Sequence, residues 1–135
     1  MNVEDDTLVI VRGINDDFFK ENFGNLCISF GGDSRAVPVK DAYYVGLYLG
    51  APDSAITHIG IVEKIERGDT PLYADFYLKA VIRLNHPVDP GHQIRKHEYW
   101  DLSDFKLEPA LMEILKVTLL NIKAVSYTHL TLPTT

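Results

Sequence analysis

Short apolar runs that end at glycine or at turn residues recur along most of the chain. Three of them, "TLVIVRG" (residues 7–13), "NLCISFGG" (25–32) and "YYVGLYLG" (43–50), have the length of a single strand. Apolar runs this short, bounded by turn-forming residues, are typical of strands buried in a sheet. The sequence therefore predicts a buried strand in each of the three segments.

Two longer segments follow, over residues 55–65 and 75–88. The first is apolar on both faces in its middle, which predicts an interior strand with Ile56 and His58 on the face opposite to Ile59 and Ile61. The second alternates more strictly and predicts a strand with one core face and one partly solvated face. Its core face consists of Phe76, Leu78, Ala80, Ile82 and Leu84, and its other face of Tyr77, Lys79, Val81 and Arg83.

Helical patterns occur near both ends of the chain. Residues 15–24 offer Asn15 or Asp16 as an N-cap and Gly24 as a stop signal, which predicts a short helix. Residues 93–105 predict a short extended piece and a helical turn. Residues 106–125 predict a helix with Pro109 near its start, where a missing N–H costs little. Its buried face would consist of Leu107, Leu111, Ile114, Leu115, Thr118 and Ile122.

The order of these elements predicts an α+β fold. Too few helices separate the strands for a doubly wound parallel sheet, so we expect a small curved or closed β-barrel with flanking helices. The chain has 135 residues, which is the size of one domain. We place this domain at residues 1–124. Residues 125–135, "VSYTHLTLPTT", resemble the translation of an adapter used in sequencing libraries, so we expect a non-native tail of metagenomic origin.

Charge is distributed unevenly along the chain, whose net charge is −6. Residues 1–57 carry nine carboxylates against four basic side chains, whereas residues 79–97 carry four basic side chains against one carboxylate, Asp89. Non-specific nucleic-acid affinity depends on many neutralised phosphates, so any nucleic-acid binding must be local. No apolar stretch has the length of a membrane span, and the acidic N-terminus does not resemble a secretory signal. We expect a cytoplasmic protein that does not bind membranes.

Motifs for metal binding and covalent catalysis are missing from the sequence. His86, His92 and His97 lie close together, but their spacing matches no zinc pattern, and solvated turn histidines are favoured. The single cysteine, Cys27, lies in an apolar run and is expected to be a small buried residue. No nucleophile elbow or phosphate-binding glycine loop occurs. We therefore predict no metal site, no cofactor and no catalytic residue.

Aromatic and hydrogen-bonding side chains gather near the ends of the predicted strands. Such groups can stack on a flat heterocycle, hydrogen-bond its edge and hold a neighbouring phosphate. A structural alternative is that each aromatic belongs to the core, and that a backbone carbonyl satisfies His58. Gly60 could allow a ligand close to the backbone. The candidate binding residues are Tyr43, Tyr44, His58, Arg95, Lys96, Tyr99 and Trp100.

Four segments together resemble the PUA-like superfamily, especially its EVE, YTH-like and ASCH-like branches. They are "YYVGLYLG", "SAITHIGIVEKIE", "YLKAVIRLNHPV" and "IRKHEYWDLSDF", and the similarity covers residues 7–105. The resemblance implies a small curved β-barrel that binds RNA or DNA, often through a modified base in an aromatic pocket. The acidic first half departs from typical nucleic-acid binders.

Three hypotheses follow from the residues and the resemblance. The first is a non-enzymatic module that recognises a modified or flipped-out base, with the four aromatics stacking, His58 at the base edge and the two basic residues at a phosphate. The second is an ASCH-like hydrolase of modified nucleosides that uses Lys40, Thr57 and Glu63. The third is an interaction factor of phage or mobile-element origin that binds a basic protein or sequesters a small nucleotide.

Overall fold

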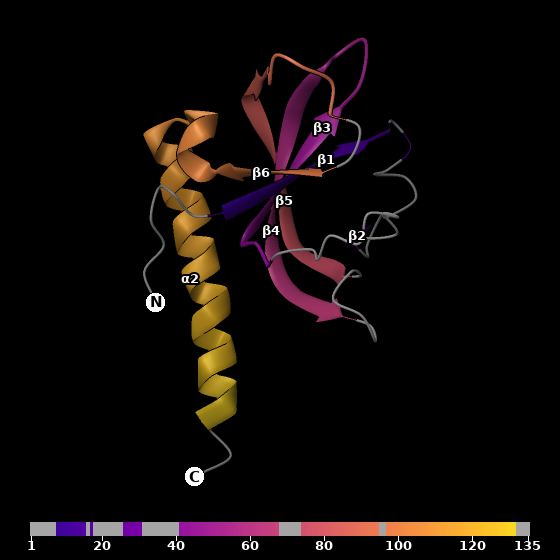
Figure 1. Cartoon of the computed structure of the whole chain (residues 1–135). Coiled ribbons are helices and arrows are strands. Elements are labelled where there is room, and N and C mark those ends of the chain that lie inside the picture. Colours follow the sequence, from indigo (N-terminus) through magenta and orange to yellow (C-terminus); the bar gives the residue numbers. More distant parts are fainter. Residues whose placement is uncertain are drawn as a thin grey trace.

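The computed structural model describes residues 8–15, 17, 26–30, 41–67, 74–94 and 97–131, with side chains as far as Ile122. Most of the helix predicted over residues 15–24 lies outside these residues, and so do Lys40, Arg95 and Lys96. The predicted strands, the helical turn and the C-terminal helix are all present (Figure 1). They are β1 (Leu8–Ile14), β2 (Cys27–Phe30), β3 (Tyr44–Leu49), β4 (Ala55–Arg67), β5 (Ala74–Val88), β6 (His97–Asp101), the 3₁₀ turn η1 (Leu102–Phe105) and α2 (Pro109–Thr131).

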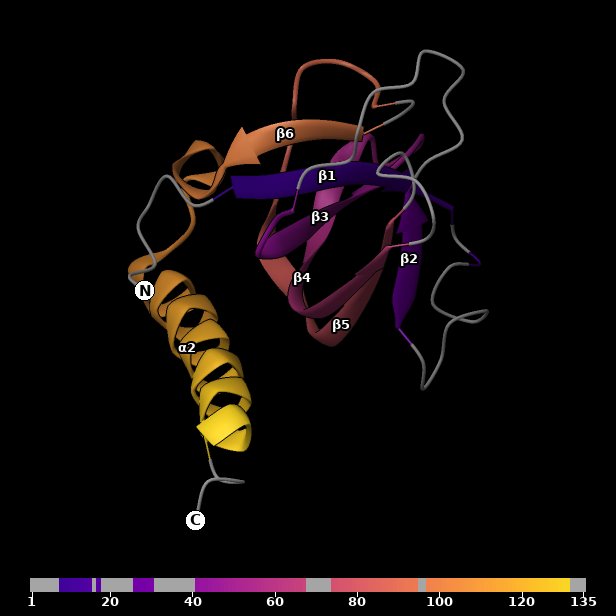
Figure 2. The ribbon, with the colours of Figure 1, turned by 60° about the horizontal axis from the view of Figure 1, so that its bottom comes forward.

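The strands form one mixed sheet in the order β2-β5-β4-β3-β1-β6. Strands β1 and β3 are parallel, and every other neighbouring pair is antiparallel. The sheet curls into a half-barrel, and α2 runs along one side of it (Figure 2). The predicted small, curved α+β fold is confirmed at this level. Within the described residues, no helix is long and apolar enough to cross a membrane.

Irregular pairing between β4 and β5 bends the sheet. The register shifts between Ile56 and His58 and again at Val62. A bulge adds a residue to one strand, increases its twist and moves the following side chains to the other face. Strict alternation was therefore the wrong prediction for both strands. Ile56 lies in the same core cluster as Ile59, whereas β5 changes faces near Lys79, so that Leu78 and Ala80 belong to different clusters.

The two faces of the sheet bury two separate apolar clusters. One face packs against η1 and α2, and its cluster joins sheet residues such as Val9 and Ile59 to Phe105 and Leu115. We call this the helix face. The other cluster contains Ile10, Val45, Leu47, Phe76 and Leu78. Burying both faces explains why β1 and β3 are almost continuously apolar.

The second cluster lies inside the curl of the sheet. Arg12 on β1 donates a hydrogen bond to the backbone carbonyl of Ser29 on β2. Because β5, β4 and β3 separate these two strands in the sheet, the contact requires the sheet to wrap around the side chain of Arg12. We call this inner surface the concave face.

Helix α2 begins at Pro109, as predicted, but its buried face is rotated from the expected one. Leu115 and Leu119 are buried at 0 % and 2 % exposure, whereas Ile114 is 52 % exposed. Positions i and i+4 share one helix face, so this pair sets the phase against the sheet. Ile114 was therefore wrongly assigned to the core. The helix continues through Thr131, into the segment that we expect to be non-native.

Candidate functional site

A row of side chains crosses the concave face at one level of the sheet. The strand register pairs Arg83 of β5 with His58 of β4, His58 with Leu47 of β3, Leu47 with Arg12 of β1, and Arg12 with His97 of β6. Directly paired residues of neighbouring strands point to the same face. Two arginines and two histidines are therefore placed on the concave face by four different strands, and Leu47 of β3 lies between them. We call Arg12, His58, Arg83 and His97 the cationic row.

Arg12 supplies a positive charge inside the curl. Its side chain is partly buried, and burial lowers the pKa of its guanidinium. An arginine remains protonated at any physiological pH, so the charge persists. The hydrogen bond to the carbonyl of Ser29 holds the side chain across the concave face. A fixed, partly desolvated arginine is suited to binding a phosphate or carboxylate.

His58 lies in the middle of the row and is half-buried. Its Nδ1 lies 2.7 Å from the hydroxyl oxygen of the neighbouring Thr57. Burial, followed by the positive charge of Arg83, lowers the pKa of His58. A histidine with a lowered pKa is neutral at neutral pH, and a neutral imidazole offers both a donor and an acceptor. His58 can therefore hydrogen-bond the edge of a heterocycle, as predicted from the sequence.

Tyr99 brings an aromatic ring beside the cationic row. It pairs with Ile10 of β1, one level further along the sheet, and packs against the concave-face cluster. Its ring contacts that of His97 edge to face, with a centroid distance of 5.5 Å. The carboxylate of Asp101 follows on the same face of β6, where the residue is exposed and paired with Leu8. Along the concave face of β6, the ring of Tyr99 therefore lies between His97 of the cationic row and the carboxylate of Asp101.

The other predicted aromatics lie on the helix face. Tyr44 has no exposed surface, and its hydroxyl donates to the carbonyl of Leu115 at 3.2 Å. Burial raises the pKa of that hydroxyl. Trp100 packs on Phe105 with ring centroids 5.0 Å apart, and Tyr43 packs against the same cluster. Because successive residues of a strand point to opposite faces, Tyr99 and Trp100 cannot line one pocket. The single aromatic pocket expected from the sequence is therefore split between two faces.

One further expectation, the role of Gly60, can be compared with the structure. A side chain at Gly60 would place its Cβ 2.7 Å from a δ carbon of Leu78, so the lack of a side chain there allows close core packing. The sequence had instead suggested close approach of a ligand to the backbone at Gly60. Arg95 and Lys96, expected at a phosphate, lie outside the described residues, although they directly precede His97.

Arg12, Arg83 and His97 were not predicted as site residues. The available signal was Arg12, a charged residue inside the apolar run "TLVIVRG". A charge within a buried strand requires a partner or a ligand, which marks the position as unusual. The sequence places Arg83 on a partly solvated strand face. It places His97 in the cluster "IRKHEYW" but does not select it as a binding residue. Only the strand register reveals that these side chains share one level of the sheet.

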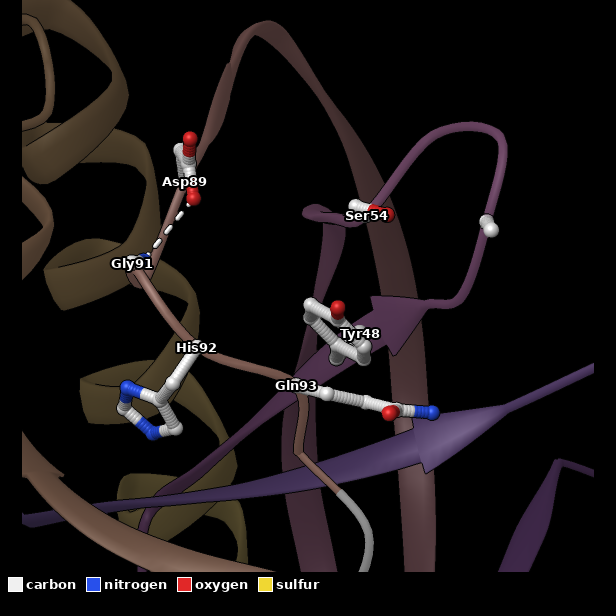
Figure 3. Close-up of a pocket in the computed structure, with 7 residues that line it drawn as sticks. Tyr48, Ser54, Asp89, Gly91, His92 and Gln93 are labelled. Carbon is white, nitrogen blue, oxygen red and sulfur yellow. Dashed lines mark hydrogen bonds between the residues drawn. The ribbon is translucent and has the colours of Figure 1, made fainter.

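A separate cavity of about 350 Å³ lies at the edge of the fold, between the β3–β4 turn and the segment that follows β5 (Figure 3). Its lining includes Tyr48, Ser54, Asp89, Gly91, His92 and Gln93. None of them was a predicted binding residue. The sequence signals are the two turns "APDS" (residues 51–54) and "DPGH" (residues 89–92), whose proline and glycine are typical of connections between strands.

Within the described residues, no group of three or more metal-binding side chains occurs. No protein family, curated protein or solved structure matches the chain. The fold and the site define a small half-barrel whose concave face carries two arginines, two histidines and an aromatic ring.

Proposed function

We propose that the protein is a recognition module that binds a nucleobase or nucleotide on its concave face, the base being modified or flipped out of a nucleic acid. The observation that carries this proposal is the cationic row next to Tyr99. The row supplies positive charge from Arg12 and Arg83 and a neutral imidazole from His58. The resemblance to the PUA-like superfamily supports the same class of ligand.

Each part of such a ligand has a counterpart in the cationic row or in the adjoining Tyr99. A phosphate would accept charge-assisted hydrogen bonds from the arginines, which match its geometry. The edge of the base would exchange hydrogen bonds with His58, and its face would stack on Tyr99. Because the chain as a whole is acidic, this attraction acts locally. A single nucleotide or a short single-stranded segment suits such a surface better than a long duplex.

A thermal unfolding assay on the full chain tests the proposal. The panel contains methylated and unmethylated nucleoside monophosphates, cyclic nucleotides, and short DNA and RNA strands that carry one methylated base. A ligand that binds only the folded state should add about 2.7 kcal/mol at 100 times its dissociation constant. Failure of every member of the panel would contradict nucleobase recognition, and would favour the interaction factor that binds a basic protein.

A pair of variants on β5 controls for charge. Arg83 and Lys79 are both exposed on this strand, but only Arg83 belongs to the cationic row. Arg83→Gln should reduce the stabilisation by the panel's best ligand, whereas Lys79→Gln, which removes the same charge, should leave it nearly unchanged. Equal losses in both variants would mean that the ligand responds only to net charge.

Hydrolysis of modified nucleosides is a second candidate function, favoured by one contact. The hydroxyl of Thr57 lies 2.7 Å from Nδ1 of His58, whose lowered pKa keeps it able to accept a proton. Of the other residues considered for this role, Glu63 is exposed and Lys40 lies outside the described residues. Turnover of modified cytidines that is lost in Thr57→Val would support the enzyme, and binding without turnover would exclude it for those substrates.

A further inference from the structure

We propose that the cavity between the β3–β4 turn and the segment after β5 is a second site, which binds a small organic amine. It is independent of the concave face, because its wall residue Tyr48 belongs to the helix-face cluster. Tyr48 lies between Ser54 of the turn and Gln93 of the opposite segment (Figure 3). The cavity volume of about 350 Å³ is near the lower end for ligand pockets, which limits the occupant to a small molecule.

The charge of the lining favours a cation. Asp89 carries a carboxylate at the rim, and one of its oxygens accepts a hydrogen bond from the backbone N–H of Gly91 at 2.8 Å. This bond fixes the carboxylate without neutralising it. The imidazole of His92 is paired with Glu98, whose carboxylate oxygen lies 2.6 Å from its Nε2, so this ring adds no unpaired positive charge to the lining. The described lining residues include no lysine or arginine, so an anion would meet no fixed positive charge there.

The remaining polar groups can both donate and accept hydrogen bonds. The hydroxyl oxygens of Tyr48 and Ser54 and the side-chain oxygen of Gln93 can each accept a hydrogen bond. An ammonium group has three donors and no acceptor, and a charge-assisted bond to a carboxylate is among the stronger hydrogen bonds. The carboxylate of Asp89 is therefore the group that favours a primary amine over a neutral polyol or a carboxylate.

The turn that carries Ser54 holds an uncommon backbone conformation. Ser54 has a φ of 49°, in the left-handed region that glycine adopts most easily. Ser54→Gly would therefore suit the turn while removing the hydroxyl from the cavity wall. This substitution separates the role of the hydroxyl from that of the fold.

Three probes with the same carbon chain test the charge preference: cadaverine, which has two amines, pentanediol, which is neutral, and glutarate, which is anionic. Each is titrated into the isotope-labelled full chain while backbone amide NMR signals are followed. We expect saturable shifts at Ser54, Gly91 and Gln93 with cadaverine, and much weaker shifts with the other two. Absence of saturable shifts with cadaverine, or equal shifts with pentanediol, would overturn the proposal.

Asp89→Asn and Asp53→Asn form a matched pair of variants. Asparagine retains the acceptor for the N–H of Gly91, so the turn should survive the first change. Asp53 precedes Ser54, is exposed and is outside the cavity lining, so the second removes the same charge nearby. We expect Asp89→Asn to weaken cadaverine binding at least fivefold, Ser54→Gly to weaken it less, and Asp53→Asn to leave it unchanged. Equal weakening by the two aspartate variants would assign the effect to surface charge and overturn the site.

Discussion

At the residue scale, the setting of His58 determines what the concave face can do. Burial and the charge of Arg83 both disfavour its protonated form, and both act in the folded state only. Such a group is a neutral hydrogen-bonding partner at neutral pH, and it acquires charge only at lower pH. In the proposed complex, His58 would then bind the edge of the base, and the arginines of the row would bind the phosphate.

This setting predicts how stability depends on pH. Between the lowered pKa of folded His58 and the ordinary value of 6.5, the unfolded chain binds more protons at this residue than the folded chain does. Stability should therefore rise with pH through that window, and it should fall as the pH decreases through it. An NMR titration of the histidine should give a pKa below 6.5 in the wild type.

Arg83→Gln should raise the pKa of His58, because it removes the second cause of the shift. Lys79→Gln serves as the control with the same change in charge. A pKa of His58 at or above 6.5, or an equal response to both substitutions, would contradict the described environment.

At the element scale, the phase of α2 makes a sharp prediction about stability. Leu115 is fully buried against the sheet, whereas its neighbour Ile114 is 52 % exposed. Leu115→Ala should cost about 2–5 kcal/mol in the free energy of unfolding, because it removes core contacts and leaves a cavity. Ile114→Ala, a change of similar size, should cost no more than about 0.5 kcal/mol. Chemical denaturation of both variants measures the difference, and equal costs would mean that the helix packs in another phase.

The sequence predicted elements better than it predicted their faces. Apolar runs and turn residues located all the described strands and the start of α2, because these signals are local. Bulges in β4 and β5 depend on pairing between strands, and no local pattern marks the extra residue. The face of α2 was misassigned for a related reason. Its apolar residues surround much of the helix, and only contact with the sheet selects Leu115 and Leu119 over Ile114.

The candidate site was only partly accessible from the sequence. His58 and Tyr99 were predicted and share the concave face, whereas Trp100 and Tyr44 were grouped with them because they are close in sequence or of the same type. Arg12 and Arg83 lie 71 positions apart and share one level of the sheet only through the register of the two intervening strands, β3 and β4. Long-range pairing of this kind is a property of the fold and cannot be derived from spacing.

At the scale of the whole molecule, a local positive site on an acidic protein predicts weak salt dependence. The net charge is −6, and within the described residues the cationic row contributes two arginines to the concave face. If about two phosphates of a single strand are neutralised, the logarithm of affinity should fall with the logarithm of salt concentration with a slope of about −1.4. Fluorescence anisotropy with a short labelled strand at several salt concentrations measures this slope. A slope several times steeper would indicate an extended phosphate-binding surface elsewhere.

Ligand binding at the concave face is the property from which the proposed function follows. The most direct test is to map backbone and side-chain NMR shifts of the full chain during titration with methylated nucleoside monophosphates. We predict saturable shifts at Arg12, His58, His97 and Tyr99, with Trp100 and Tyr43 on the helix face unaffected. Saturable shifts confined to the helix face, or no saturable shift with any member of the set, would contradict the account.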